Sequence, residues 1–383
     1  MKSLVLAEKP SVARDIARVL GCHKNISGAI EGSNYIVTWA LGHLVTLADP
    51  EEYDKKFKAW DMSYLPMVPK KWELVVIKQT SKQYHNVKTQ LFRKDVSEII
   101  IATDAGREGE LVARWILDKS GCHKPIRRLW ISSVTDKAIK EGFAHLKDGR
   151  AYNDLYHAAR SRAEADWLVG INATRALTCK YNAQLSCGRV QTPTLAMIAH
   201  REQQIRSFKP EDYYGLRCTT SVTGGSVGTM ASIVTWTWQQ KKSGSLRSFN
   251  KDLITGLDKK LKNQTLTVTD VHTSSKRTPS PGLYDLTELQ RDANKRFGFS
   301  AKETLNIMQS LYEHHKVLTY PRTDSRYIGT DIVPTIKERL KACNIGPYKK
   351  YIPELLKKPL KTSKAFVDDK KVSDHHAIIP TEE

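Results

Sequence analysis

The segment Thr319-Tyr320-Pro321-Arg322 places a phenol two residues from a guanidinium. Proline disfavours helical backbone in the residue before it, so the segment is predicted to be extended. Residues i and i+2 of extended backbone point to the same side, and Tyr320 and Arg322 can therefore face one target. An arginine favours the phenolate and can donate two hydrogen bonds to a phosphate. The pair suggests a tyrosine that attacks a phosphodiester. The alternative is a buried tyrosine and a surface arginine in a turn.

Two carboxylates are predicted to end neighbouring strands. Glu8 follows the apolar residues 4–7, and Asp104 follows the apolar run 99–103. Sites in parallel sheets lie beyond the carboxyl ends of the strands, so the two carboxylates can converge. With Glu108 one helical turn on, they predict a site for Mg²⁺, which takes one or two carboxylates together with waters and substrate phosphates. For Asp104 alone, the alternative is a helix N-cap.

Lys9 is adjacent to Glu8, and Pro10 and Ser11 open a predicted helix whose amino end favours phosphate. Lys9 could therefore contact or neutralise a scissile phosphate. An ordinary surface lysine is the alternative, with about even weight.

Composition points to a polyanionic partner. The chain has 383 residues and a formal net charge of +20, which favours nucleic acid before a membrane. No apolar run approaches the roughly 20 residues needed to cross a bilayer. The apolar residues 1–7 stop at Glu8, which predicts a buried strand rather than a signal peptide. Six scattered cysteines without a C-x-x-C pair fit a reducing cytosol and predict no zinc site. No phosphate-binding loop of the ATPase type is present, so ATP use is not predicted.

A second group of residues is suited to phosphate, sugar and base contacts. Residues 186–195 form a loop followed by a helix start, in which Gly188 allows close backbone approach and Cys187 is interpreted as a small filler. Trp167 on the preceding helix is either core or a stacking platform. Trp60 lies in a basic loop. The full predicted strand-contacting set is Trp60, Arg162, Asp166, Trp167, Arg175, Ser186, Cys187, Gly188, Arg189, Val190, Gln191, Thr192 and Arg322.

Residues 1–150 alternate short apolar runs with amphipathic stretches. Strands are predicted over 3–7, 35–41, 72–77, 98–102 and 126–131, and helices over 10–20, 81–92, 107–119 and 135–146. This alternation predicts a mostly parallel sheet covered on both faces.

The remainder changes character several times. The pattern is helical over 152–206 with a break at 182–188, and it has period two over 213 to about 273, including 232–238 and 265–269. Residues 274–282 form a basic, turn-rich linker. Helices are predicted over 285–297 and 300–314, the second with a Ser300–Glu303 capping box. Residues 349–371 are rich in lysine and are expected to be solvated.

Five motifs in order carry a resemblance that covers essentially the whole chain. They are A-E-K-P-S at Ala7, T-D-A-G-R-E-G-E at Thr103, S-C-G-R-V-Q-T-P-T-L at Ser186, L-T-Y-P-R-T-D-S at Leu318 and H-H-A-I-I-P-T at His375. With them the chain resembles type IA DNA topoisomerases.

The resemblance implies a multidomain fold, in which an α/β domain is followed by helical and β-rich domains. Together they would form part of the type IA topoisomerase toroid. The parts would be a Toprim domain with a parallel sheet and an acidic Mg²⁺ site over 1–150, part of a helical strand-binding domain over 151–210, part of a β-rich arch domain over 211–278, and an incomplete helical domain with the active-site tyrosine over 279–383.

It also implies roles for the reacting residues. Tyr320 would be the nucleophile that forms a 5′-phosphotyrosyl bond with one DNA strand, and Arg322 would position and stabilise the phosphate. Glu8 would be the general acid toward the leaving 3′-hydroxyl, and Lys9 would support the same phosphate. His375 would touch the scissile group, with a packing role as the alternative.

The implied cofactor is Mg²⁺, held by Glu8 and Asp104 with help from Glu108, and no ATP is needed because the covalent link conserves the energy of the phosphodiester. The implied partner is single-stranded or underwound DNA, which a cytoplasmic, nucleoid-associated monomer would relax or decatenate. Gly106 stands where the family usually has a second aspartate, so a single, looser Mg²⁺ site is expected. The chain stops at Glu383, and we expect it to be the amino-terminal portion of such an enzyme.

Two rival functions share some of these features. A Toprim nuclease or primase would use the acidic site without a tyrosine. A non-catalytic or cleavage-only fragment that binds single-stranded DNA would account for the charge.

Overall fold

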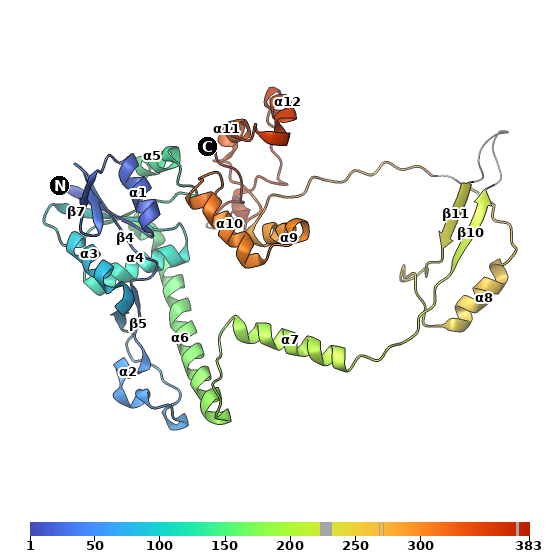
Figure 1. Cartoon of the computed structure of the whole chain (residues 1–383), viewed down its shortest axis with the longest axis horizontal. Helices are drawn as coiled ribbons and strands as arrows, with labels where there is room; N and C mark the ends of the chain where they lie inside the picture. The colour runs from blue at the N-terminus through green and yellow to red at the C-terminus, as the bar shows by residue number, and fades with distance from the viewer. Residues whose placement is uncertain (223–231, 268, 271, 373–374) are drawn as a thin grey trace. The chain divides into compact units, whose positions relative to one another are not determined.

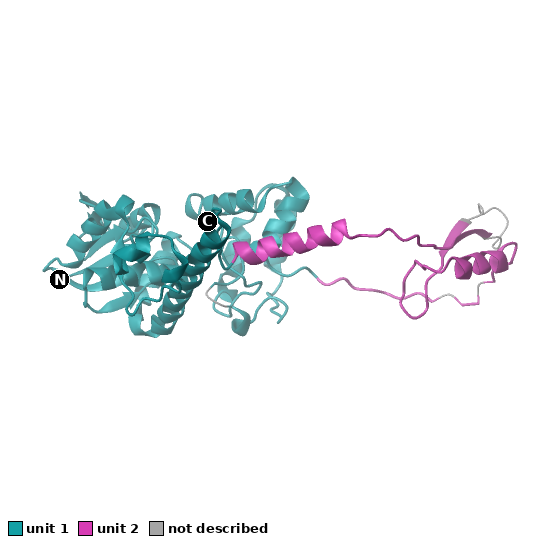
Figure 2. Ribbon diagram, turned by 90° about the horizontal axis from the view of Figure 1, so that it is seen from below, with its two compact units in different colours: residues 1–189, 280–383 teal, residues 190–279 magenta. Residues whose placement is uncertain are grey.

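The computed structural model describes residues 1–222, 232–267, 269–270, 272–372 and 375–383. They form two compact units, the first made of residues 1–189 and 280–383 and the second of residues 190–279 (Figure 2). The linker predicted over 274–282 contains the boundary at Pro279. No helix among the described residues is both long enough and apolar enough to cross a membrane.

The first unit contains a seven-stranded sheet in the order β2-β3-β4-β1-β7-β8-β9. Its inner strands β4, β1, β7 and β8 are parallel, and β2, β3 and β9 join antiparallel at the two edges. The predicted mostly parallel sheet is therefore confirmed. The strands are β1 (Lys2–Ala7), β2 (Lys24–Ile26), β3 (Ala29–Glu31), β4 (Tyr35–Trp39), β7 (Val96–Ala102), β8 (Ile126–Arg128) and β9 (Lys147–Asp148).

Helices cover both faces of this sheet, because successive strand residues point to opposite sides. Leu4 and Leu6 of β1 pack in one apolar cluster with α3 (Ser81–Leu91), α4 (Arg107–Ser120) and α6 (Asn153–Tyr181). Val5 and Ala7 pack in the other cluster with α1 (Pro10–Val19) and α5 (Asp136–Ala144). The predicted helices of residues 1–150 thus end within a few residues of the observed ones. The long helix α6 extends past the sheet, and residues of the α2 (Pro50–Tyr53) region lie along it (Figure 1).

One predicted strand lies outside the parallel sheet. The run 72–77 contains β6 (Leu74–Val76), which pairs antiparallel with β5 (Val45–Leu47) in a separate two-stranded sheet. All three residues of β6 are only partly buried, so its apolar character does not reflect a position between two helical layers. The short edge strands β2, β3 and β9 were not predicted.

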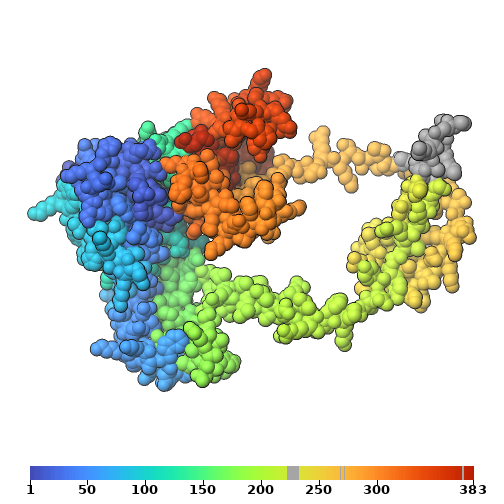
Figure 3. Space-filling model, in the orientation of Figure 1, coloured from blue at the N-terminus to red at the C-terminus, as the bar shows by residue number. Residues whose placement is uncertain are grey.

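The carboxyl-terminal part of the first unit carries the tyrosine segment. It contains α9 (Leu286–Phe297), α10 (Ala301–Glu313), α11 (Ile336–Ala342) and α12 (Ile352–Lys357). The predicted capping box at Ser300 and Glu303 is present. Tyr312 of α10 packs in the same apolar cluster as α1 and α5, which joins the tyrosine segment to the sheet. Figure 3 shows the orange surface of this part against the blue surface of the first residues of the chain.

The second unit contains α7 (Gln191–Arg206), an antiparallel pair β10 (Arg217–Val222) and β11 (Ser232–Thr237), and α8 (Lys251–Leu261). The break between α6 and α7 lies where it was predicted. The expectation of strand-like structure throughout 213–273 is wrong at α8, where the Asn250 side chain caps the helix by accepting from the Leu253 N–H. Residues 265–267 and 269 form no strand, and Val268 lies outside the described residues.

Candidate active site

Two neighbouring parallel strands bring Glu8 and Asp104 together. β1 and β7 pair in register up to Ala7 and Ala102, and each acid follows just beyond the end of its strand. The backbone N–H of Asp104 donates to Oε2 of Glu8 at 3.1 Å. The convergence of two carboxylates that the sequence predicts is therefore present at this edge of the sheet.

A buried ion pair fixes the loop that carries Asp104. Arg128 is fully buried, and its Nε donates to Oε2 of Glu110 at 3.0 Å, with both side chains inaccessible to solvent. Its Nη atoms donate to the backbone carbonyls of Thr103 at 2.8 Å and Asp104 at 2.7 Å. Since a buried charge is stable only when paired and hydrogen-bonded, this network holds the loop in one conformation. The sequence analysis did not identify Arg128 or Glu110.

Two glycines of the same loop differ in the space around them. A Cβ on Gly109 would lie 2.1 Å from the carbonyl oxygen of Asp104, so only glycine allows the helix to approach the loop this closely. A Cβ on Gly106 would meet nothing within 4 Å, and the backbone there is extended, with φ of 173°. A side chain at this position would therefore meet no obstacle at its Cβ.

Tyr320 reaches the acid pair from the carboxyl-terminal part of the first unit. Its backbone N–H donates to the carbonyl of Ser132 at 3.0 Å, and its hydroxyl donates to Oδ2 of Asp104 at 3.4 Å. Its ring stacks on His375 with centroids 4.2 Å apart and meets the edge of Tyr312 at 5.5 Å. The ring is thus clamped between two aromatic neighbours while its oxygen faces a carboxylate.

Burial dominates the electrostatics of these three groups. Desolvation, reinforced by the charge of Asp104, raises the pKa of Glu8 to about 6. Desolvation also raises the pKa of Asp104. The pKa of Tyr320 is raised by burial and by the nearby carboxylates, and the charge of Arg322 opposes this only in part. The sequence-based expectation that Arg322 favours the phenolate holds as a contribution, but the phenol is protonated in this arrangement.

Lys9 forms an ion pair that the sequence did not predict. Its Nζ lies 2.6 Å from Oε1 of Glu313, the last residue of α10. Burial disfavours the charged lysine, but the hydrogen bond with Glu313 and the charges of Asp104 and Glu8 outweigh it and raise the pKa of Lys9. Gln309 also donates to Glu313. Glu313 thus adds a third carboxylate near the acid pair. Its position seven residues before Tyr320 was the one signal available.

His375 lies against the tyrosine rather than in solvent. Thr323 donates to its backbone carbonyl at 3.0 Å, and the residue as a whole is 5% exposed. Neither ring nitrogen has a hydrogen bond within the usual distance and angle limits among the described residues, although the backbone of Ala105 faces the ring. Burial lowers the pKa of His375 to about 4, so the ring is neutral at pH 7.

These groups open onto a cavity of about 670 Å³. Several residues that were predicted to react, to hold a metal ion or to contact the DNA strand line this cavity. The predicted residues that line it are Glu8, Asp104, Glu108, Arg162, Tyr320, Arg322 and His375. The exposed guanidinium of Arg322 and the acid pair therefore share one space large enough for a phosphodiester segment.

Glu108 lies in this cavity but is engaged elsewhere. Its carboxylate is 3.4 Å from Arg162 and 3.8 Å from His43, and its side chain is 60% exposed. The hydrogen bond with His43 is the largest effect that lowers its pKa. Among the described residues, no three acids, histidines or cysteines form a cluster suited to a metal ion.

A chain of ion pairs leads away from Glu108 along α6. Arg162 lies 4.0 Å from Asp166, and Arg189 lies 2.7 Å from the same carboxylate. The predicted strand-contacting residues Arg162, Asp166 and Arg189 are therefore one connected, exposed network. Ser186, Val190, Gln191 and Thr192 are exposed, and Cys187 and Gly188 are half-buried.

Three other predicted contacts are placed differently. Trp167 is buried, stacks edge-on with Tyr53 and Trp72, and donates to the carbonyl of Ala48 at 2.9 Å, so the core alternative describes it. Arg175 is buried, donates to the carbonyl of Phe57 and lies 5.0 Å above the ring of Trp60. The contacts of Trp167 and Arg175 that the structure shows are internal, and their contact with a DNA strand stays a prediction. Trp60 is half exposed, and its contact with a strand stays a prediction.

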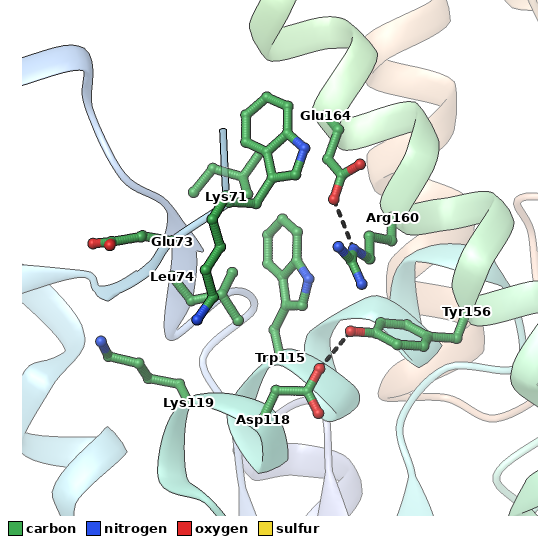
Figure 4. Close-up of a pocket in the computed structure, with 11 residues that line it drawn as sticks. Lys71, Glu73, Leu74, Trp115, Asp118, Lys119, Tyr156, Arg160 and Glu164 are labelled. Atoms are coloured by element: carbon green, nitrogen blue, oxygen red, sulfur yellow. Dashed lines mark hydrogen bonds and ion pairs between the residues drawn. The ribbon is translucent and has the colours of Figure 1, made fainter. Parts of the chain in front are cut away.

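A second cavity of about 570 Å³ lies between β6, α4 and α6 (Figure 4). Two pairs of its polar groups are hydrogen-bonded to each other: Tyr156 donates to Asp118 at 2.5 Å, and Arg160 donates to Glu164 at 2.7 Å. None of the residues predicted to react or to contact a strand lines it.

The acid pair fits a divalent cation. Desolvation raises the pKa of both carboxylates; the charge of Asp104 adds to the rise at Glu8, and the charge of Glu313 adds to the rise at Asp104. A bound cation relieves such repulsion. Mg²⁺ needs only one or two carboxylates when waters and phosphate oxygens complete its shell. Glu8 and Asp104 meet this requirement. Glu108 does not approach them closely enough to form a three-ligand cluster.

Comparisons with known proteins identify the family of the chain. A DNA topoisomerase family model matches residues 150–383, and a Toprim domain model matches residues 3–134. The chain therefore belongs to the type IA DNA topoisomerase family. Within it, the chain is a homologue of DNA topoisomerase 3: the proteins of that name from Bacillus cereus and Bacillus subtilis are 64% identical over 381 residues and 61% identical over 382 residues.

The chain spans about half the length of these relatives, since each match covers 100% of this chain and 51% of the relative. The solved structure of full-length topoisomerase I from Thermotoga maritima superposes with a TM-score of 0.65 at 22% identity, covering 99% of this chain and 55% of that one. That likeness confirms the fold, a Toprim domain followed by helical and small-sheet regions.

Proposed function

We propose that this chain cleaves and rejoins one strand of DNA through a covalent bond to Tyr320, without ATP. The observation that carries the proposal is the placement of the Tyr320 hydroxyl beside Asp104, in a cavity that Arg322 and Glu8 also line. Family membership supports it, because the residues that form this cavity come from both matched regions. In the longer relatives, a second strand would pass through the break before it is resealed.

The reaction is a transfer of one phosphoester bond to another. The Tyr320 oxygen attacks phosphorus, the bond from phosphorus to the 3′-oxygen breaks, and a 5′-phosphotyrosyl link remains. The carboxylate of Asp104 lies where it can accept the phenolic proton. Glu8, with a pKa raised to about 6, is the proposed donor of a proton to the leaving 3′-oxygen. Rejoining reverses each transfer.

Arg322 and Lys9 have complementary proposed roles. Arg322 is exposed in the cavity and donates to the phosphate oxygens. Lys9 is held by Glu313 and would exchange part of that contact for the phosphate when DNA binds. His375 packs against the ring of Tyr320, which favours positioning of the ring. Mg²⁺ would be held by Asp104, and by Glu8 in its ionised form, and would supply positive charge next to the scissile phosphate.

The strand would follow the ion-pair network of α6. Arg162, Asp166 and Arg189 connect the cavity to the loop at residues 186–189, where exposed donors are available. We propose single-stranded DNA as the substrate, because the family resemblance implies it and because this network offers one line of exposed charged groups from the cavity for a single strand to follow.

A trapping experiment tests the proposal. The chain is mixed with single-stranded oligonucleotides labelled at either end and then denatured with detergent. We expect a protein–DNA adduct that retains only the 3′-terminal label and is absent in Tyr320→Phe. Cut ends without attached protein would favour a Toprim nuclease instead. Retention of DNA without cutting at any Mg²⁺ concentration would favour a strand-binding fragment.

A further inference from the structure

Residues 337–364 form a lysine-rich surface on the first unit. The segment has nine basic and two acidic residues, which gives it a formal excess of seven positive charges. The basic residues are Lys337, Arg339, Lys341, Lys349, Lys350, Lys357, Lys358, Lys361 and Lys364. So dense a charge on one short segment repels itself and favours binding of an anion.

Few of these charges are neutralised within the protein. Glu338 pairs with Lys137 of α5 at 2.7 Å, and Glu354 pairs with Lys358 at 2.9 Å. The two acids of the segment are thus occupied. In the part of the chain that the structure describes, seven lysines of the segment have no carboxylate within ion-pair distance: Lys337, Lys341, Lys349, Lys350, Lys357, Lys361 and Lys364. One of them, Lys350, lies over the ring of Tyr351.

Aromatic rings are exposed between these lysines. Tyr348 is 59% exposed and Tyr351 54% exposed, and they flank Lys349 and Lys350 in the chain. Buried Ile352 anchors this stretch, and α11 and α12 pack on each other, so the surface is held by the fold rather than hanging as a tail. In Figure 3 the segment lies in the orange-red surface at the top of the view. The sequence predicted that this lysine-rich segment is exposed to solvent, and most of its residues are exposed. It did not predict the helices α11 and α12 within the segment.

The lysine-rich surface is tied directly to the tyrosine segment. Arg339 of α11 donates to the carbonyl of Pro380 at 2.7 Å. Pro380 in turn bridges Leu318, two residues before Tyr320. A polymer that leaves the cavity at Tyr320 therefore has a basic, aromatic surface fixed to the same part of the fold.

We propose that the lysine-rich surface binds a further stretch of the single-stranded DNA held at Tyr320. Its lysines contact phosphates, and Tyr348 and Tyr351 stack on unpaired bases. Single strands are favoured over duplex because duplex bases present no free faces to a ring. The inference rests on the proposed function, since it extends the strand that the cavity holds.

The test compares two charge-matched variants of the full chain in a Tyr320→Phe background. One replaces Lys349, Lys350, Lys357 and Lys361 with glutamine. The control replaces four exposed lysines of the Toprim domain in the same way: Lys78, Lys82, Lys88 and Lys94. Binding to single-stranded oligonucleotides of increasing length is measured by fluorescence anisotropy over a range of salt concentrations, and circular dichroism confirms that both variants fold.

We expect the affinity of the first variant for DNA to stop rising at a certain oligonucleotide length. The affinities of the parent chain and of the control should continue to rise beyond that length. On the longest oligonucleotide, the first variant binds about tenfold more weakly, and its salt dependence is shallower by about 3 if four phosphate contacts are lost. A Tyr348→Ala, Tyr351→Ala pair weakens single-strand binding but leaves duplex binding unchanged. Equal length and salt dependence in the two lysine variants would overturn the proposal, as would an unchanged affinity in the tyrosine pair.

A second readout separates this inference from the proposed function. With Tyr320 intact, the lysine variant should form the covalent adduct on a short oligonucleotide as well as the parent chain does. If the parent chain forms no adduct on any oligonucleotide, the proposed function fails, while the length and salt comparison still decides whether this surface binds DNA.

Discussion

The hydroxyl of Tyr320 lies 3.4 Å from Oδ2 of Asp104, although 216 residues separate them in the chain. This contact joins a strand end of the Toprim domain to an extended segment of the topoisomerase region. Each side is fixed by its own framework: buried Arg128 holds the Asp104 loop, and Tyr312 and His375 hold the tyrosine ring. The predictions below test these frameworks one at a time.

Gly109→Ala should disrupt the site. The added Cβ would lie 2.1 Å from the carbonyl oxygen of Asp104, so the helix or the loop must move. Overpacking of this kind costs roughly 1–3 kcal/mol in the free energy of unfolding. Urea denaturation measures that loss, and the adduct yield should fall with it. If the variant had unchanged stability and formed as much adduct as the parent chain, the loop would be able to move without loss, which would contradict the prediction.

Gly106→Asp should tighten Mg²⁺ binding and leave the fold intact. A Cβ at this position meets nothing within 4 Å, and the residue lines the cavity. A third carboxylate next to Glu8 and Asp104 should lower the Mg²⁺ concentration needed for half-maximal rejoining by about tenfold. Gly106→Ala is the control and should behave like the parent chain. If alanine alone abolishes rejoining, glycine itself is required there.

The single variant Arg128→Met should be less stable than the double variant Arg128→Met, Glu110→Leu. Removing Arg128 leaves the buried carboxylate of Glu110 with Arg114, 3.0 Å away, as its remaining ion-pair partner among the described residues, which costs up to about 3–5 kcal/mol. Removing both Arg128 and Glu110 avoids a buried carboxylate that has lost one of its two partners. The double variant should still lose adduct formation, because the carbonyls of Thr103 and Asp104 lose their donor. Equal stability of the single and double variants would contradict a coupled pair.

Stability should depend on the buried histidines below neutral pH. Burial holds the pKa of His375 at about 4 and lowers that of His376, while each has a pKa of about 6.5 in the unfolded chain. Between these values the unfolded chain binds more protons, so the free energy of unfolding falls as the pH falls from about 6.5 toward 4. For His375 the full loss is up to about 3 kcal/mol.

Glu8 acts in the opposite direction. Its pKa is raised to about 6, so the folded chain binds its proton first and gains stability as the pH falls through that value. The informative quantity is therefore the difference between the parent chain and His375→Phe, which keeps a ring against Tyr320. The variant should lose less stability than the parent chain from pH 7 to pH 4. Parallel curves would contradict a neutral buried His375.

The framework of the site could be predicted from the sequence because it follows from local rules. Strands with continuous apolar residues alternate with helices, and acids at the ends of parallel strands meet at one edge. Glu8 and Asp104 were identified in this way, and Tyr320 was identified from the extended backbone before Pro321, which places it on the same side as Arg322. The family resemblance added the order of the motifs.

The remaining features depend on contacts between distant residues, which no local pattern encodes. Arg128 looks like an ordinary strand residue until its burial against Glu110 is seen. Glu313 looks like a helix-surface acid until α10 brings it to Lys9. Trp167 could stack on a base or in the core, and its burial, its contacts with Tyr53 and Trp72 and its hydrogen bond to Ala48 depend on residues that are distant in the sequence. The helix α8 was missed because its flanking residues read as strands.

The most direct test of the central claim is mass spectrometry of the trapped adduct. The chain is allowed to react with a single-stranded oligonucleotide, denatured, and digested with a nuclease and with trypsin. We expect the peptide of residues 317–322, which contains Tyr320, to carry a nucleotide through a phosphate on the tyrosine oxygen. A nucleotide attached to any other residue, or an adduct that forms equally well in Tyr320→Phe, would contradict the account.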